Sequence, residues 1–96
     1  MKTPEEYADE LAAYREGFAA NVRRLREEHK PTWSQTDLHN ATRLHRTEIG
    51  RIENGETEPR LGTLHILADA LGVSLDRFTE GLAVLVTRKP PPPRPK

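Results

Sequence analysis

The side chains best suited to specific chemistry lie on one side of a short helix predicted over residues 45–54. Arg46, Thr47 and Arg51 are polar, and their spacing places them on its outer side. An arginine can donate two hydrogen bonds to guanine in the major groove of DNA, and a threonine methyl can contact thymine. We therefore predict that these three residues contact bases; the alternative is that the pattern marks only a solvated helix face.

The opposite side of this helix is predicted to face the protein interior. Ile49 and Ile52 lie three residues apart, and Glu53 lies beside them. A carboxylate on an inner face needs a cationic partner, so Glu53 is interpreted as structural. Glu48, at the edge of the polar side, either accepts a hydrogen bond from cytosine or repels phosphate. Gly55 follows the helix and is a residue type that commonly ends one.

A second short helix is needed to hold the first one in place. Ser34 and Asp37 predict a helix N-terminus, because a serine hydroxyl caps free amides and an acid in the first turn complements the helix dipole. This helix is predicted from about Gln35 to Ala41. A break over residues 42–44 then separates the two helices.

Apolar residues at helical spacing predict further helices on both sides of this pair. A helix is predicted over about residues 4–29, with Gly17 either separating two helices or bending one. A fourth helix is predicted over residues 61–71, and a short fifth one follows Ser74 and ends at Gly81. The helix over residues 4–29 carries an apolar stripe, which we assign to the core and to a dimer contact. The stripe comprises Tyr7, Leu11, Tyr14, Phe18, Val22 and Leu25.

The end of the chain differs in composition from the rest. Leu82–Val86 is apolar and fits a helix extension or a strand. Prolines at 90–93 and 95, flanked by basic residues, predict a disordered tail. The predicted organisation is an N-terminal helical extension over residues 1–17, a DNA-binding domain over residues 18–81, and a short apolar segment with a basic Pro-rich tail over residues 82–96.

Composition argues against several classes of protein. The 96 residues fit one domain, and the absence of cysteine excludes disulfides and thiolate zinc sites. There is no phosphate-binding glycine loop and no nucleophile beside a base, so we predict no enzymatic activity and no cofactor. We also predict no metal site, because no two histidines are spaced i, i+4. The histidines are His29, His39, His45 and His65.

Charge and hydropathy bear on location and partners. Fifteen basic and fifteen acidic residues cancel, so few phosphates would be neutralised and affinity for non-specific DNA should be modest. Residues 1–17 carry five acidic and two basic side chains, whereas residues 82–96 carry four basic side chains and no acidic one. The acidic start and the lack of a long apolar run predict a soluble cytoplasmic protein without a membrane partner.

Residues 34–55 read SQTDLHNATRLHRTEIGRIENG, and this segment resembles the repressor/Cro-type (Xre family) helix-turn-helix. The resemblance covers roughly residues 18–80 and implies an all-α, five-helix repressor/Cro-like bundle, here with an extra N-terminal helix. It also implies sequence-specific binding of double-stranded DNA by a transcriptional regulator, with a repressor favoured and helix 45–54 in the major groove. The matching positions are Ser34-Gln35, Leu38, Leu44, Arg46-Thr47, Ile49, Arg51-Ile52-Glu53, Gly55, Pro59, Leu61, Leu64 and Ala70–Val73.

The resemblance further implies contacts with the DNA backbone. It places Gln35, His45, Asn54 and Arg60 near phosphates, and Arg43 can join them from the turn. Contacts of this kind add affinity without reading sequence.

The resemblance also implies an ion pair between Arg26 and Glu53. Two positions differ from the usual family pattern. His39 stands where a small residue is usual, and Arg43 stands where glycine is usual. A non-glycine residue at positive φ costs on the order of 1 kcal/mol.

One recognition helix covers few base pairs, so a homodimer on a two-fold site is expected, with half-sites about 34 Å apart. The candidate dimer surfaces are the fifth helix with Leu82–Val86 and the exposed side of the N-terminal helix. The alternative is an antitoxin or a protein-interaction module with this fold, whose partner would be a protein such as a toxin. The neutral net charge favours that alternative, and the arginines of helix 45–54 favour DNA.

Overall fold

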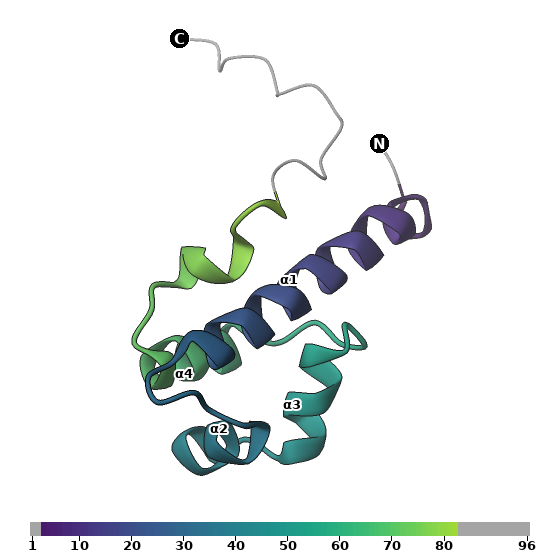
Figure 1. The fold of residues 1–96 in the computed structure, drawn as a ribbon. Coiled ribbons are helices and arrows are strands. Elements are labelled where there is room, and N and C mark those ends of the chain that lie inside the picture. The colour runs from purple at the N-terminus through teal and green to yellow at the C-terminus, as the bar shows by residue number, and fades with distance from the viewer. Residues whose placement is uncertain (1–2, 83–96) are drawn as a thin grey trace, which may run out of the picture.

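The computed structural model describes residues 3–82, and over this range the chain is all-α (Figure 1). Two short 3₁₀ helices, η1 and η2, accompany four α-helices. The predicted tail and all but the first residue of the apolar run at 82–86 lie outside the described residues. The elements are η1 (Pro4–Tyr7), α1 (Ala8–Glu28), α2 (Gln35–Thr42), α3 (Arg46–Glu53), α4 (Leu61–Leu71) and η2 (Leu75–Thr79).

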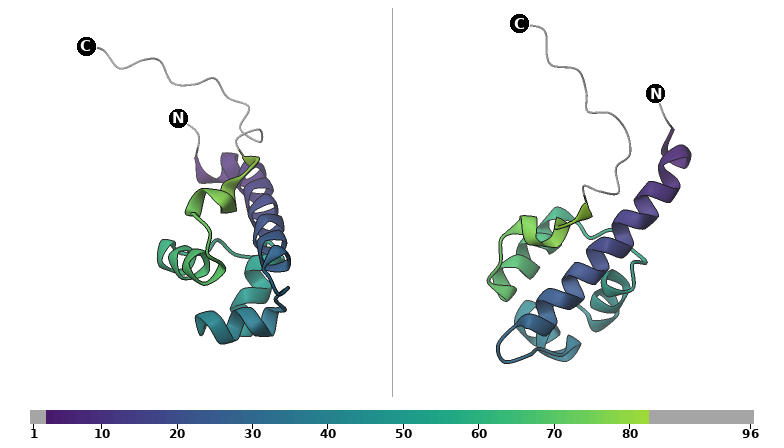
Figure 2. Two further views of the ribbon diagram at one scale, coloured as in Figure 1. Left: turned by 60° about the vertical axis from the view of Figure 1, so that its left-hand side comes forward. Right: turned by 45° about the horizontal axis from the view of Figure 1, so that its top comes forward.

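The first α-helix runs without a break through Gly17. A glycine inside a helix costs about 1 kcal/mol, and the packing of α1 against α3 and η2 offsets that cost. The extra N-terminal helix expected from the sequence is therefore the first half of α1. The right-hand view in Figure 2 shows that this end of α1 projects beyond the other helices.

The predicted fifth helix is a 3₁₀ turn of five residues, η2. Segments this short commonly adopt the tighter 3₁₀ form. Asn21 of α1 holds the turn in place, because its side-chain amide donates to the carbonyls of Phe78 (2.8 Å) and Glu80 (3.0 Å). The expectation of five helices plus an extra one is thus corrected to four α-helices and two 3₁₀ turns within residues 3–82.

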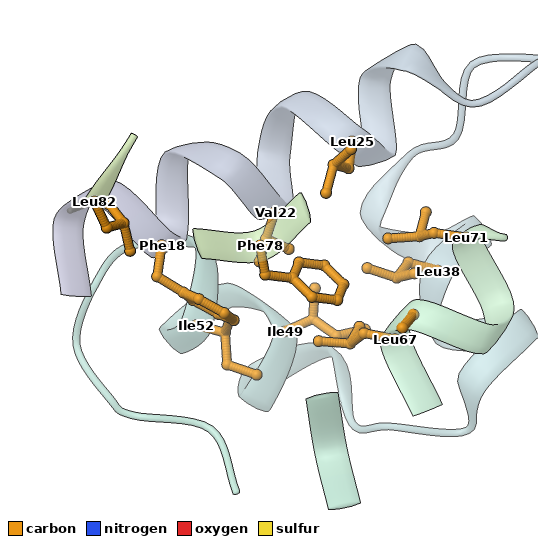
Figure 3. Close-up of a cluster of buried hydrophobic side chains, with 11 residues drawn as sticks. Phe18, Val22, Leu25, Leu38, Ile49, Ile52, Leu67, Leu71, Phe78 and Leu82 are labelled. Carbon is orange, nitrogen blue, oxygen red and sulfur yellow. The ribbon is translucent and has the colours of Figure 1, made fainter. Parts of the chain in front are cut away.

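One hydrophobic core joins all four α-helices and η2 (Figure 3). The Phe78 ring lies between α1 and α4, with its centroid 5.7 Å from that of Phe18. Burying large apolar side chains is the main favourable term in folding, so this core fixes how the helices cross. Its members are Phe18, Val22, Leu25, Leu38, Ile49, Ile52, Leu67, Ala68, Leu71, Phe78 and Leu82.

The start of α2 is capped as the sequence predicts. The Ser34 hydroxyl accepts from the Asp37 amide (3.1 Å), and the Asp37 carboxylate accepts from the Ser34 amide (2.8 Å). The hydrogen bond that the Ser34 amide donates to the Asp37 carboxylate lowers the pKa of Asp37. The Ser34 side chain lowers it further, to a smaller extent. The reciprocal pair satisfies two amides that the helix itself leaves free.

This lowered pKa predicts a pH dependence. Because the folded-state pKa of Asp37 lies below its unfolded value of about 4, the carboxylate stabilises the fold above that pH. The contribution is lost as pH falls through the folded-state pKa. Urea unfolding of the native chain and of Asp37→Asn should therefore differ at pH 7, and the difference should shrink as the pH falls below the unfolded value. A difference that stays constant with pH would contradict this role.

The turn between α2 and α3 is held by side chains of α2. Thr42 donates from its hydroxyl to the Leu38 carbonyl (2.7 Å) and accepts from the Leu44 amide (3.2 Å). The His39 ring hydrogen-bonds to the Leu44 carbonyl through Nδ1. The larger residue at position 39 is therefore accommodated by a bond to the turn. Arg43 ends α2 at φ 65°, ψ 9°, the left-handed conformation anticipated there.

Replacing Arg43 with glycine should stabilise the protein. Glycine removes the steric cost of a Cβ at positive φ, and its greater unfolded-state entropy offsets part of the gain. We expect the free energy of unfolding to rise by about 0.5–1 kcal/mol in urea titrations. Arg43→Ala retains the Cβ and serves as the control, with little change expected. A loss of stability in Arg43→Gly would show that the arginine side chain itself stabilises the turn.

Candidate nucleic-acid interface

The inner face of α3 is fully buried. Ile49, Ile52 and Glu53 expose 1%, 2% and 1% of their surface, and both isoleucines belong to the core (Figure 3). The inner face predicted from the sequence is therefore confirmed. Since α3 packs against both α1 and α2, its orientation follows from the core.

The buried Glu53 carboxylate joins three helices. Arg26 of α1 donates to both of its oxygens, from Nε to Oε2 and from Nη2 to Oε1, each at 2.8 Å. Gln35 of α2 donates from Nε2 to Oε1 at 3.2 Å. Hydrogen bonding to Glu53 raises the pKa of Arg26, which keeps the guanidinium charged. The expected partnership of Arg26 and Glu53 is confirmed.

The C-terminal end of α3 is also held by specific bonds. Gly55 follows it at φ 73°, and the Glu56 amide donates to the Arg51 carbonyl (2.9 Å), which gives the Schellman geometry. Arg23 of α1 donates from Nη1 to the Glu53 carbonyl, a contact that the sequence did not indicate. These bonds fix where α3 ends and the connection over residues 56–60 begins.

The three predicted base contacts all lie exposed on α3. Thr47 and both arginines are open to solvent, and neither arginine forms an ion pair with any side chain of residues 3–82. Their hydrogen-bond donors are therefore available to an external ligand. A helix that is held by the core on its inner face and presents free guanidinium groups on its outer face is suited to binding base edges or phosphates.

A polar hollow of about 500 Å³ lies beside α3. Two of the predicted base contacts, Thr47 and Arg51, line it, whereas Arg46 does not. Two residues that the sequence analysis missed, Thr57 and Thr63, also line it. The only feature of the sequence that could have pointed to these two threonines is that their hydroxyl groups lie on either side of Arg60. The return of the chain into α4 is what brings them next to α3.

The predicted DNA-backbone contacts are arranged less uniformly. His45 and Arg60 both line the hollow and are the N-cap residues of α3 and α4, so the free amides of two helices begin beside it. Asn54, the C-cap of α3, and Arg43 are both exposed. Gln35 is half-buried and directs its amide inward to Glu53, which leaves one amide hydrogen for an outer partner.

Acidic groups moderate the charge of this surface. Glu48 is half-buried on α3 and lines the hollow, as does Glu58 on the connection. Glu58 is paired with Arg15 of α1 at 3.3 Å, which reduces its net effect on a bound anion. Within residues 3–82 this surface therefore combines arginines that form no ion pair, Arg46, Arg51 and Arg60, with the acidic Glu48.

Other kinds of site find little support within residues 3–82. No group of three histidine, aspartate or glutamate side chains there is placed to hold a metal ion. None of the helices in this range combines the length and the apolar character needed to cross a membrane.

Comparison with known proteins gives one result. A family model described as helix-turn-helix matches residues 22–78, a range that begins within α1, contains α2, α3 and α4, and ends in η2. Comparison with curated proteins and with solved structures gave no match.

Proposed function

Because the chain belongs to the Cro/C1-type, Xre-like helix-turn-helix family, we propose that it is a sequence-specific transcriptional repressor that places α3 in the major groove of DNA. The observation that carries the proposal is the division of α3 into two faces. Its inner face is held by the core and by Arg26, while its outer face presents Arg46, Thr47 and Arg51 without partners among residues 3–82.

Sequence would be read mainly by the two arginines. Each guanidinium can donate a bidentate pair to the O6 and N7 of guanine, and the Thr47 methyl can contact thymine. Gly50 lies between them on α3, and a Cβ built there would meet no atom within 4 Å. Packing within the protein therefore does not demand glycine at this position. We interpret its small size as room for close approach of α3 to the bases.

Affinity would come from contacts with the backbone around α3. Arg60 and Arg43 supply exposed cations, and His45 begins α3, where free amides can bind a phosphate. Asn54 and the second amide hydrogen of Gln35 add neutral donors. If Arg43 contacts phosphate, the stabilised Arg43→Gly and the Arg43→Ala control should lose DNA affinity equally.

A homodimer on a two-fold site completes the proposal. One α3 contacts only a few base pairs, and two copies would read half-sites about 34 Å apart. A sedimentation mass of one chain at micromolar concentration, both alone and on DNA, would contradict this part.

The alternative function is an antitoxin or a protein-interaction module with the same fold. The neutral net charge favours it, because such a chain gains little general attraction to DNA. Its partner would be a protein such as a toxin.

Selection of bound sequences from random duplex DNA tests the proposed function. We expect a two-fold motif to be enriched, with the half-sites one helical turn apart. The selection should be done at low salt, where binding through a few phosphate contacts is strongest. If no motif is enriched under those conditions, sequence-specific recognition is wrong and the protein-binding alternative gains.

A further inference from the structure

A second hollow, which is apolar, lies on the other side of the connection over residues 57–59. It has a volume of about 270 Å³ and is bounded by the N-terminal half of α1, this connection, α4 and the last described residues. We call it the apolar groove. The residues that give it this character are Leu11, Tyr14, Phe18, Pro59, Leu64 and Leu82.

Nothing within residues 3–82 covers the outer part of this groove. Leu11 leaves 39% of its surface exposed, and Tyr14 and Leu64 are only half-buried. The N-terminal half of α1 forms its long wall. The right-hand view in Figure 2 shows that this half of the helix projects beyond the others. When an apolar segment covers such a hollow, apolar surface is removed from water and the free energy of the protein falls.

The course of the chain indicates which segment would cover it. The described chain ends at Leu82, which is 6% exposed and already part of the groove wall. The next four residues, Ala83–Val86, are all apolar. In extended form they reach at most about 13–14 Å. The wall from Leu11 to Phe18 is about 10 Å long at the rise of an α-helix, so the lengths agree.

We propose that Ala83–Val86 of the same chain packs into the apolar groove against Leu11 and Tyr14. Leu82 holds the segment next to the groove. The local concentration of this tethered segment at the groove therefore exceeds that of the same segment from a second copy at micromolar protein concentration. Charge is also complementary. The basic residues that follow, Arg88 and Lys89, would continue toward a helix end that is acidic in total, with five acidic side chains against two basic ones over residues 1–17.

The groove also has a link to α3. Residues Thr57, Glu58 and Pro59 line both the apolar groove and the polar hollow beside α3. The Arg15–Glu58 pair joins this connection to α1 at 3.3 Å. A segment packed in the groove would therefore hold the connection, and Arg60 after it, in place. This consequence for DNA rests on the proposed function, whereas the packing itself does not.

The packing is tested in the full chain with Val84→Ser/Leu85→Ser, and Pro91→Ser/Pro92→Ser serves as the matched control farther along the tail. We expect the first double variant to lower the Tm by about 4 °C or more and the control to leave it unchanged. In a Leu11→Ser background, the serine pair at 84 and 85 should lower the Tm much less, because the contact is already lost. Equal effects in both backgrounds would overturn the proposal.

Nuclear Overhauser contacts give the direct readout. The Leu85 methyl groups should show contacts to the Tyr14 ring within one molecule. If these contacts appear only between differently labelled chains, a second copy fills the groove and the proposal is wrong. If they are absent altogether, it is also wrong. DNA selection with the native chain decides the proposed function separately, so failure of one can be told from failure of the other.

Discussion

Replacing Arg26 with alanine is expected to lower the free energy of unfolding by about 3–5 kcal/mol, because it leaves the Glu53 carboxylate buried without a cation. Glu53 exposes only 1% of its surface and would retain a single side-chain donor, the Gln35 amide. Arg26 also donates to the Trp33 carbonyl (2.9 Å), so the connection between α1 and α2 would loosen as well. Urea unfolding at neutral pH measures the loss.

Arg15→Ala is the matched control for this variant. Arg15 lies on the same helix, but its ion pair with Glu58 is exposed, and such pairs contribute about 0–1 kcal/mol. The double variant Arg26→Met/Glu53→Met should recover most of the stability lost in Arg26→Ala, since both charges are then absent. If Arg26→Ala unfolds at nearly the native urea concentration, the carboxylate is satisfied in another way and the role assigned to the pair is wrong.

Arg46→Ala and Arg51→Ala are expected to weaken DNA binding by about 1–3 kcal/mol each at the base position that the arginine reads, and to relax selectivity there. Their folding stability should change by less than about 0.5 kcal/mol, because both side chains are exposed and unpaired within residues 3–82. Competition binding with single-base variants of the selected site measures the effect.

Arg60→Ala separates base reading from phosphate binding. Because Arg60 is a proposed backbone contact, Arg60→Ala should weaken binding to all DNA sequences about equally. It should also reduce the slope of log affinity against log salt concentration by about 1. If the motif selected by Arg46→Ala and Arg51→Ala equals the native motif, these arginines do not read bases. If Arg60→Ala changes the motif itself, its assignment to the backbone is wrong.

Much of the helix-turn-helix region is predictable from neighbouring residues. Ser34 and Asp37 begin α2, and Gly55 follows α3, because capping depends on groups only a few positions apart. The buried side of α3 follows from the spacing of Ile49 and Ile52. The ion pair of Arg26 with Glu53 was expected only through family resemblance, since no local pattern joins two residues so far apart.

Other features depend on groups that meet only in the folded chain. A glycine at position 17 weakens a helix by an amount that the packing of α1 against α3 and η2 outweighs. Gln35 is polar and begins a helix, yet its amide lies close enough to Glu53 to bond inward. Likewise, no periodicity could show that Asn21 would donate to the backbone of η2.

The residues on the outer face of α3 were predictable from residue types and helical spacing alone, because side-chain direction in a helix repeats every 3.6 residues. The surroundings of that face were not. Thr57, Pro59 and Thr63 come beside α3 through the chain's return into α4, and the same connection bounds the apolar groove against α1. Both hollows exist because segments distant in sequence pack on one core, and that packing is set by the summed burial of side chains from every helix.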